Sequence, residues 1–246
     1  MTARELYQAG KLDEAVQALN GEVRDNPSDP KRRTFLFELL CFAGNYDRAE
    51  KQLQILAQEN KDAQMGALIY HAALHAERTR HELFQKKEYP RPAGDDPQSP
   101  PGIWNGKPFA SMMDADARIG PRLEVYAAGQ YLWIPFEHIT SVEMQAPKRL
   151  RDLLWAPALV HTSAAFKGRE LGEILVPALT PFSWQHANDA VKLGRMTDWQ
   201  DLEDGQTVPV GQKMFLIDNE EVPLLELRHL EFQPAPVSAD QHAAAR

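Results

Sequence analysis

A block of six residues recurs near the start of the chain after thirty-four positions. Residues 10–15 read GKLDEA and residues 44–49 read GNYDRA, and apolar positions outside the block, such as Leu6 and Leu40, repeat with the same offset. This is the period of the tetratricopeptide unit, a pair of antiparallel helices that buries its apolar face by stacking on a neighbouring pair. The repeat therefore predicts a stack of helical hairpins, a scaffold that usually holds another polypeptide.

Capping residues and apolar spacing predict five helices within residues 1–88. Thr2 is the expected N-cap of the first helix, and Asp29 followed by Pro30 is a typical start of the third. Gly10 and Gly44 end the first and third helices. The fifth helix is expected over residues 62–87, as the first helix of a third repeat extended into a cap. Its apolar residues at helical spacing are Met65, Leu68, Ile69, Ala72 and Ala76.

After residue 88 the pattern changes from helical to extended. Residues 89–102 contain five prolines and are expected to form a linker. The period of two that follows predicts strands at residues 123–126, 131–134, 139–144, 173–176, 213–217 and 224–232. Short helices are expected at residues 150–154 and 188–193. The predicted class is α+β, with a TPR-like helical domain over 1–88, a β-rich domain over 103–232, resembling a small barrel or sandwich, and a disordered tail over 233–246.

Composition narrows the classes of partner and compartment. The net charge of −8 argues against a nucleic-acid surface, which needs clustered Lys and Arg. The single cysteine, Cys41, excludes an internal disulfide and favours a reducing compartment. The N-terminus has no signal-peptide pattern, and no apolar run has the length needed to cross a bilayer. We expect a cytoplasmic protein that binds neither nucleic acid nor membrane.

Two clusters could in principle hold a metal ion. Asp114 and Asp116 form a DxD motif whose carboxylates could bind a divalent cation, but caps of turns and a pair with Arg118 are the favoured interpretation. His71 and His75 share one helical face, but the glutamate that serves as general base in a zinc protease is missing between them. No nucleophile elbow, Walker A loop or dinucleotide fingerprint is present. We therefore predict no catalytic residues, no cofactor and no metal site.

All five tryptophans lie in the second half of the chain. They are Trp104, Trp133, Trp155, Trp184 and Trp199. Because small β domains depend on aromatic side chains for buried area, we expect most of them in the core. The alternative is an exposed aromatic patch that grips a partner.

Several longer blocks resemble a known family. Residues 104–109, 114–121 and 129–137 read WNGKPF, DADARIGP and GQYLWIPFE, and residues 151–157 and 193–199 read RDLLWAP and LGRMTDW. In this order the blocks resemble the ImpE/SciE/TagJ family of type VI secretion accessory proteins. The resemblance implies a non-enzymatic, cytoplasmic accessory factor that binds a helix of the small sheath subunit. It also implies a link to the AAA+ ATPase that disassembles contracted sheath.

The repeat geometry suggests where a partner helix could bind. Tyr7, Glu38, Cys41 and His75 occupy first-helix positions that face the groove of tetratricopeptide stacks. Binding by the β-rich half is the alternative site. Two other functions stay open at this point: a chaperone-like adaptor for a secreted effector, and a metal-dependent enzyme that uses Asp114 and Asp116.

Overall fold

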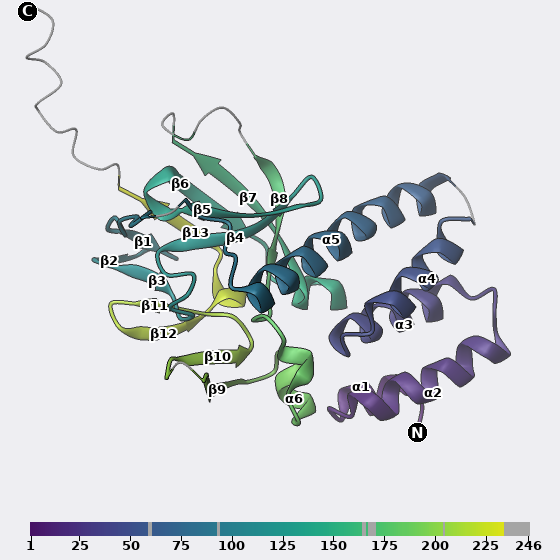
Figure 1. Cartoon of the computed structure of the whole chain (residues 1–246). Coiled ribbons are helices and arrows are strands. Elements are labelled where there is room, and N and C mark those ends of the chain that lie inside the picture. The colour runs from purple at the N-terminus through teal and green to yellow at the C-terminus, as the bar shows by residue number, and fades with distance from the viewer. Residues whose placement is uncertain (59–60, 93, 164–165, 167–170, 204, 234–246) are drawn as a thin grey trace, which may run out of the picture.

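The computed structural model describes residues 1–58, 61–92, 94–163, 166, 171–203 and 205–233. The helices at the front of the chain are α1 (Ala3–Gln8), α2 (Leu12–Asp25), α3 (Pro30–Phe42), α4 (Tyr46–Leu56) and α5 (Lys61–Lys86). They form two hairpins followed by the long helix α5, which lies against a block of strands (Figure 1). This order confirms the predicted α+β class with TPR-like helices first.

The helices begin where capping chemistry predicts. The Thr2 hydroxyl accepts a hydrogen bond from the Glu5 N–H, and the Glu5 carboxylate accepts one from the Thr2 N–H, which completes a capping box. The Asp29 carboxylate accepts hydrogen bonds from the N–H groups of Lys31 and Arg32 at the start of α3. Both predicted caps are confirmed.

The strands form three antiparallel sheets. Their bounds are β1 (Gly102–Trp104), β2 (Lys107–Phe109), β3 (Met112–Asp114), β4 (Arg122–Ala127), β5 (Gln130–Pro135), β6 (Ile139–Met144), β7 (Trp155–Thr162), β8 (Gly172–Pro177), β9 (Thr197–Asp201), β10 (Thr207–Gly211), β11 (Met214–Ile217), β12 (Glu220–Pro223) and β13 (His229–Phe232). The large sheet has the order β2-β1-β13-β6-β7-β8-β4-β5, and the smaller ones have the orders β12-β11-β3 and β10-β9. All the pairings are antiparallel.

The part of the large sheet that lies against the helices is buried on both faces, whereas β6 and β13 bury one face and expose the other. Leu123 and Val125 of β4 belong to a core shared with the sheet of β3, β11 and β12, whereas Tyr126 belongs to the core shared with the helices. The strands β5, β7 and β8 also contribute to both cores, because successive side chains point to opposite faces. The result is three layers: helices, large sheet and small sheet. This arrangement is closer to a sandwich than to a barrel.

The sequence predicted only part of the strands: β1, β2, β3, β7, β9, β10 and β12 were missed, and one predicted range was wrong. The expected single strand over residues 224–232 is wrong, because Pro223 ends β12, Leu224–Glu226 form a 3-10 turn, and only His229–Phe232 form a strand, β13, which lies between β6 and β1. This turn connects β12 of the small sheet to β13 of the large sheet. Its residues Leu224 and Leu227 are both fully buried. The strands β1 and β2 were not predicted, although Asn105 and Gly106 between them have the positive φ angles of a tight hairpin turn.

The proline-rich segment between α5 and β1 packs against strands β3, β4 and β5. Tyr89 stacks on Trp133 with ring centroids 5.4 Å apart, and Asp95 pairs with Arg122 at 3.2 Å. The hydroxyl of Ser99 donates to the carbonyl of Met112 and accepts from its N–H. These contacts attach the proline-rich segment to the sheet. The tail expected to be disordered lies outside the described residues, apart from Gln233.

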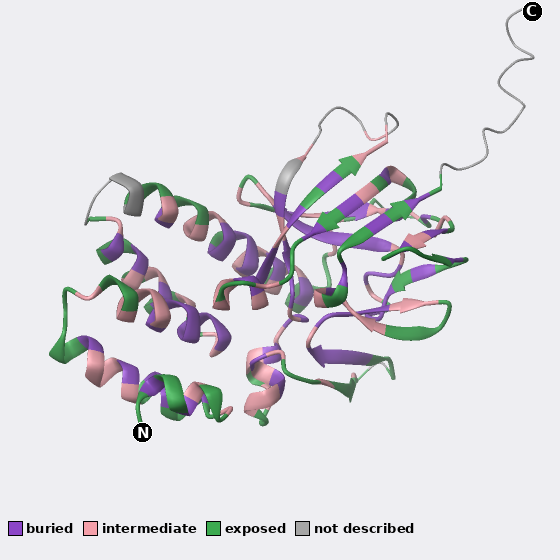
Figure 2. Cartoon of the chain, turned by 180° about the vertical axis from the view of Figure 1, so that it is seen from behind, coloured by how far each residue is buried: buried purple, intermediate pink, exposed green. Residues whose placement is uncertain are grey.

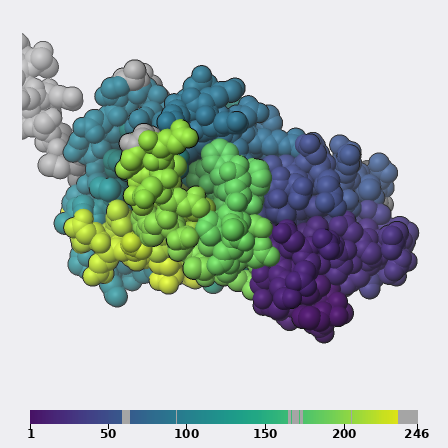
Figure 3. All heavy atoms as spheres, turned by 60° about the horizontal axis from the view of Figure 1, so that its bottom comes forward, coloured from purple at the N-terminus to yellow at the C-terminus, as the bar shows by residue number. Residues whose placement is uncertain are grey.

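A second contact joins the far end of the chain to the first hairpin. The short helix α6 (Asp189–Lys192) lies beside α2, and a space-filling view shows this green segment against the purple N-terminal helices (Figure 3). The Leu12 N–H at the start of α2 donates to the Asp189 carboxylate at 2.7 Å. Arg195 donates to the main-chain carbonyls of Tyr7 and Gln8. Helix α2 is therefore capped by a residue from the opposite end of the chain.

Burial separates covered from exposed apolar residues in both halves of the chain (Figure 2). On α5, Met65, Leu68 and Ile69 are more than half exposed, because the layers that cover this helix reach only its later turns. Trp104, Trp133 and Trp155 are buried as expected, Trp184 is half-buried and Trp199 is exposed. In the part of the chain that is described, no helix has both the length and the apolar character to span a bilayer.

Candidate functional site

An open groove lies where the first helices of the repeats meet the sheet half. It is lined from α1, α3, α5 and the 3-10 helix η2 (Leu150–Leu153), and its volume is about 530 Å³. Its lining consists of Arg4, Tyr7, Gln8, Pro30, Lys31, Thr34, Phe35, Glu38, Tyr70, Arg149 and Leu150. Three consecutive repeat positions and one segment of the sheet half thus share a single concave surface.

Aromatic rings make up much of the groove floor. Tyr7 and Phe35 meet edge to face with centroids 5.8 Å apart, and both are half-buried. The Tyr70 hydroxyl accepts a hydrogen bond from Arg151, whose guanidinium also lies 5.3 Å from the centre of the Tyr70 ring. These contacts hold the rings in place before any partner arrives, which lowers the entropy cost of binding.

Glu38 is the acidic residue of this lining. Its side chain is only 8% exposed, and burial raises its pKa to about 7, against the favourable charge of Arg151. Near pH 7, a carboxyl group with this pKa is protonated, and therefore neutral, in about half of the molecules. It can then donate a hydrogen bond as well as accept one.

The groove brings together two of the four predicted partner-binding residues. Tyr7 and Glu38 line it, whereas Cys41 lies in a separate cavity of about 20 Å³ next to Trp155 and Leu179, and His75 is exposed outside the groove lining. The physical reason is that the sheet half covers the later turns of α3. In a free-standing repeat stack Cys41 would face solvent; here it is buried against the second half of the chain.

Sequence reasoning missed several groove residues. Tyr70 is the residue of α5 that lines the groove, whereas His75, five residues later, is exposed outside it. Phe35 of α3 is half-buried and lines the groove, although the sequence pattern did not place it there. Arg149 and Leu150 come from the sheet half, and nothing in their local sequence indicates that they meet α1 and α3.

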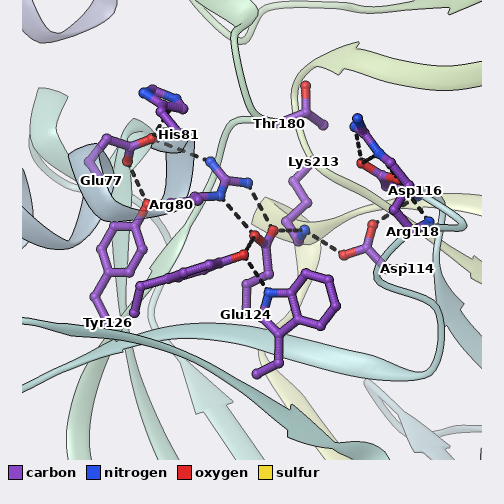
Figure 4. Close-up of polar contacts among 12 residues, drawn as sticks. Glu77, Arg80, His81, Asp114, Asp116, Arg118, Glu124, Tyr126, Thr180 and Lys213 are labelled. Atoms are coloured by element: carbon purple, nitrogen blue, oxygen red, sulfur yellow. Dashed lines mark hydrogen bonds and ion pairs between the residues drawn. The ribbon is translucent and has the colours of Figure 1, made fainter. Parts of the chain in front are cut away.

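A buried ionic network lies behind the groove, between α5 and the sheets (Figure 4). Arg80 of α5 donates twice to the Glu124 carboxylate of β4, at 2.8 Å each, and the ammonium of Lys213 contacts both Glu124 and Asp114. Tyr131 also donates to Glu124. Burial alone would raise the pKa of Glu124, but the charges of Arg80 and Lys213 hold it below its ordinary value. The network joins the helical layer to both large and small sheets.

The DxD motif belongs to this network. Asp114 is fully buried against Lys213, and Asp116 pairs with Arg118 at 2.5 Å and accepts a hydrogen bond from its N–H. The predicted pairing of Asp116 with Arg118 is present, and Lys213 is the partner that the sequence did not indicate for Asp114. Each carboxylate therefore already faces a cation of the protein. Among the described residues, no group of three or more His, Cys, Asp or Glu side chains is arranged to hold a metal ion.

Comparisons with known proteins agree with this architecture. A family model described as "ImpE protein" matches residues 106–231, and a tetratricopeptide-repeat model matches residues 6–71. The chain is 35% identical to the type VI secretion system accessory component TagJ of Pseudomonas aeruginosa, over 95% of this chain and 92% of that protein. The crystal structure of protein VPA1032 from Vibrio parahaemolyticus is similar in fold, with a TM-score of 0.80 at 22% identity, and the match covers 94% of this chain and 97% of that one. On its sequence and its repeat-plus-sheet architecture, this chain belongs to the ImpE family.

Proposed function

We propose that this protein is a non-enzymatic accessory factor of the type VI secretion system, working in the cytoplasm as an adaptor for a sheath component. The printed name of its Pseudomonas aeruginosa relative supports the type VI assignment. The expected partner is a helix of the small sheath subunit. Holding that helix would modulate sheath assembly or its recycling by the AAA+ ATPase.

The groove is the observation that carries the proposal. Its half-buried aromatic residues can receive the apolar side chains of an amphipathic helix, which is how helix-in-groove recognition works. A volume of about 530 Å³ suits a few anchoring side chains rather than a whole helix, whose diameter is about 10–12 Å. The partner would therefore lie across α1, α3 and α5 with one face inserted.

The test is a titration with a peptide that covers the N-terminal helix of the small sheath subunit from the same gene cluster. We expect saturable binding, and we expect Phe35→Ala to weaken it at least about tenfold, because central aromatic anchors dominate such interfaces. Ile55→Ala is the matched control, since Ile55 is an exposed apolar residue on α4 outside the groove lining.

Two results would count against this proposal. Absence of binding by the unaltered protein would remove the sheath helix as partner. An equal effect of both substitutions would remove the groove as its site. Recovery of a secreted effector instead of sheath in a pull-down would favour the chaperone-like alternative.

A further inference from the structure

The rim of the groove is basic although the protein as a whole is acidic. Arg4 on α1, Lys31 on α3 and Arg149 before η2 come from three separate elements, and all three are exposed in the lining of one groove. The whole chain carries a net charge of −8. Positive charge is therefore concentrated at a surface where the average composition would not place it.

Within the described residues, none of these three cations forms an ion pair. Arg4 lies 5.7 Å from the centre of the Phe35 ring, so its charge is next to the aromatic floor of the groove. Arg32, next to Lys31 in the sequence but outside the groove lining, pairs with Asp29 at 2.6 Å and contacts Glu22.

The groove lining adds little negative charge of its own. Its carboxyl group, Glu38, is buried, and burial raises its pKa to about 7. The groove thus presents an aromatic floor, a largely neutral acid and a positive rim. Complementarity to such a surface requires apolar side chains in the middle and anionic side chains at the edges.

We infer that the groove selects an amphipathic partner helix whose apolar stripe is flanked by Asp or Glu side chains, with Arg4, Lys31 and Arg149 as the residues that determine this specificity. The inference rests on the proposed function, because it describes the chemistry of the helix expected there. The rim charges steer the helix and fix its orientation, while the aromatic floor supplies most of the affinity.

The experiment compares two designed helical peptides of about 18 residues, which as a helix are about 27 Å long. Both carry the same Leu and Phe stripe, and the flanking positions are all Glu in one and all Lys in the other. We expect the Glu peptide to bind at least about tenfold more tightly, and to lose affinity between about 50 and about 300 mM salt, because exposed charges are screened.

Reversing the charges of the three rim residues tests whether they determine the preference for the Glu peptide. The triple variant Arg4→Glu, Lys31→Glu and Arg149→Glu is expected to exchange the preference and bind the Lys peptide better. Lys51→Glu is the control, since Lys51 is an exposed cation on α4 outside the groove lining. Circular dichroism checks that every variant keeps its helical content.

The outcomes separate this inference from the proposed function. Equal affinity for the two peptides, insensitivity to salt, or an unchanged preference in the triple variant would overturn the acidic-helix assignment, even where the sheath helix binds and Phe35→Ala weakens it. Rim-dependent binding of a single-stranded oligonucleotide with higher affinity than the Glu peptide would also overturn it. Failure of the sheath helix and of both peptides to bind would overturn both.

Discussion

The carboxyl group of Glu38 lies at the groove floor, largely out of contact with water. Its pKa of about 7 in the folded protein is above the ordinary value of 4.5. Folding therefore disfavours the ionised form, and the free energy of unfolding falls as pH rises from about 4.5 to about 7. Below this pH range the carboxyl group is protonated in both the folded and the unfolded state and does not lower the stability. Above this range it is ionised in both states, and the full free-energy cost of burying the charge lowers the stability.

Replacement of Glu38 by Gln is expected to relieve that cost. At pH 8 the variant should be more stable than the unaltered protein by up to about 3 kcal/mol, which is the free energy equivalent of the pKa shift. At pH 4 the two proteins should have similar stability. Urea denaturation at both values measures the difference. A gain of the same size at both pH values would contradict the assigned pKa.

At the scale of single elements, the repeated glycines Gly10 and Gly44 have different structural roles. Gly10 and Gly44 both end a helix with positive φ angles, +78° and +69°, which explains their recurrence in the sequence. Only Gly44 is also packed tightly against another side chain, since a Cβ atom there would lie 2.4 Å from the Trp184 ring. The same repeat position thus serves a backbone turn in one hairpin, and a turn plus a contact with the sheet half in the other.

Alanine substitutions separate these two effects. We expect Gly10→Ala to lower the free energy of unfolding by about 1 kcal/mol through backbone strain alone. The loss for Gly44→Ala should be larger, about 3 kcal/mol, because the ring of Trp184 must also move. Gly21→Ala, in the middle of α2 with nothing within 4 Å, should instead stabilise by about 0.5–1 kcal/mol. Urea denaturation measures all three, and equal losses at Gly10 and Gly44 would show that the Trp184 contact is unimportant.

At the scale of the whole molecule, the helices and the sheet share one core. The apolar cluster around α1 to α5 includes Tyr126, Trp133 and Trp155 from the sheet. The Arg80–Glu124–Lys213 network crosses the same boundary, and removal of one partner from such a buried set leaves uncompensated charge that costs about 3–5 kcal/mol. The halves are therefore expected to stabilise each other.

Unfolding should accordingly be a single transition. All five tryptophans lie between residues 104 and 199, so their fluorescence reports the sheet half, while circular dichroism at the helical band reports mainly α1 to α5. The two signals should have the same urea midpoint, and Glu124→Gln should shift both together. Separate midpoints would show that the helical half unfolds independently.

Local chemistry made much of the helical half predictable. Thr2, Asp29 and the repeat glycines act on backbone groups within a few residues, so their roles can be recognised in the sequence. The groove was only partly predictable. Tyr7 and Glu38 follow from the repeat, whereas Arg149 and Leu150 are brought to it by packing between segments more than one hundred residues apart.

The sequence by itself determined the repeat, the helix caps, the change from helical to extended pattern and the family resemblance, because each depends on neighbouring residues or on their order along the chain. Only the tertiary structure decided that the sheet half covers Cys41, that Lys213 neutralises Asp114, and that three cations from separate elements surround one groove. Those outcomes arise from burial and charge pairing between distant segments, which no local pattern encodes.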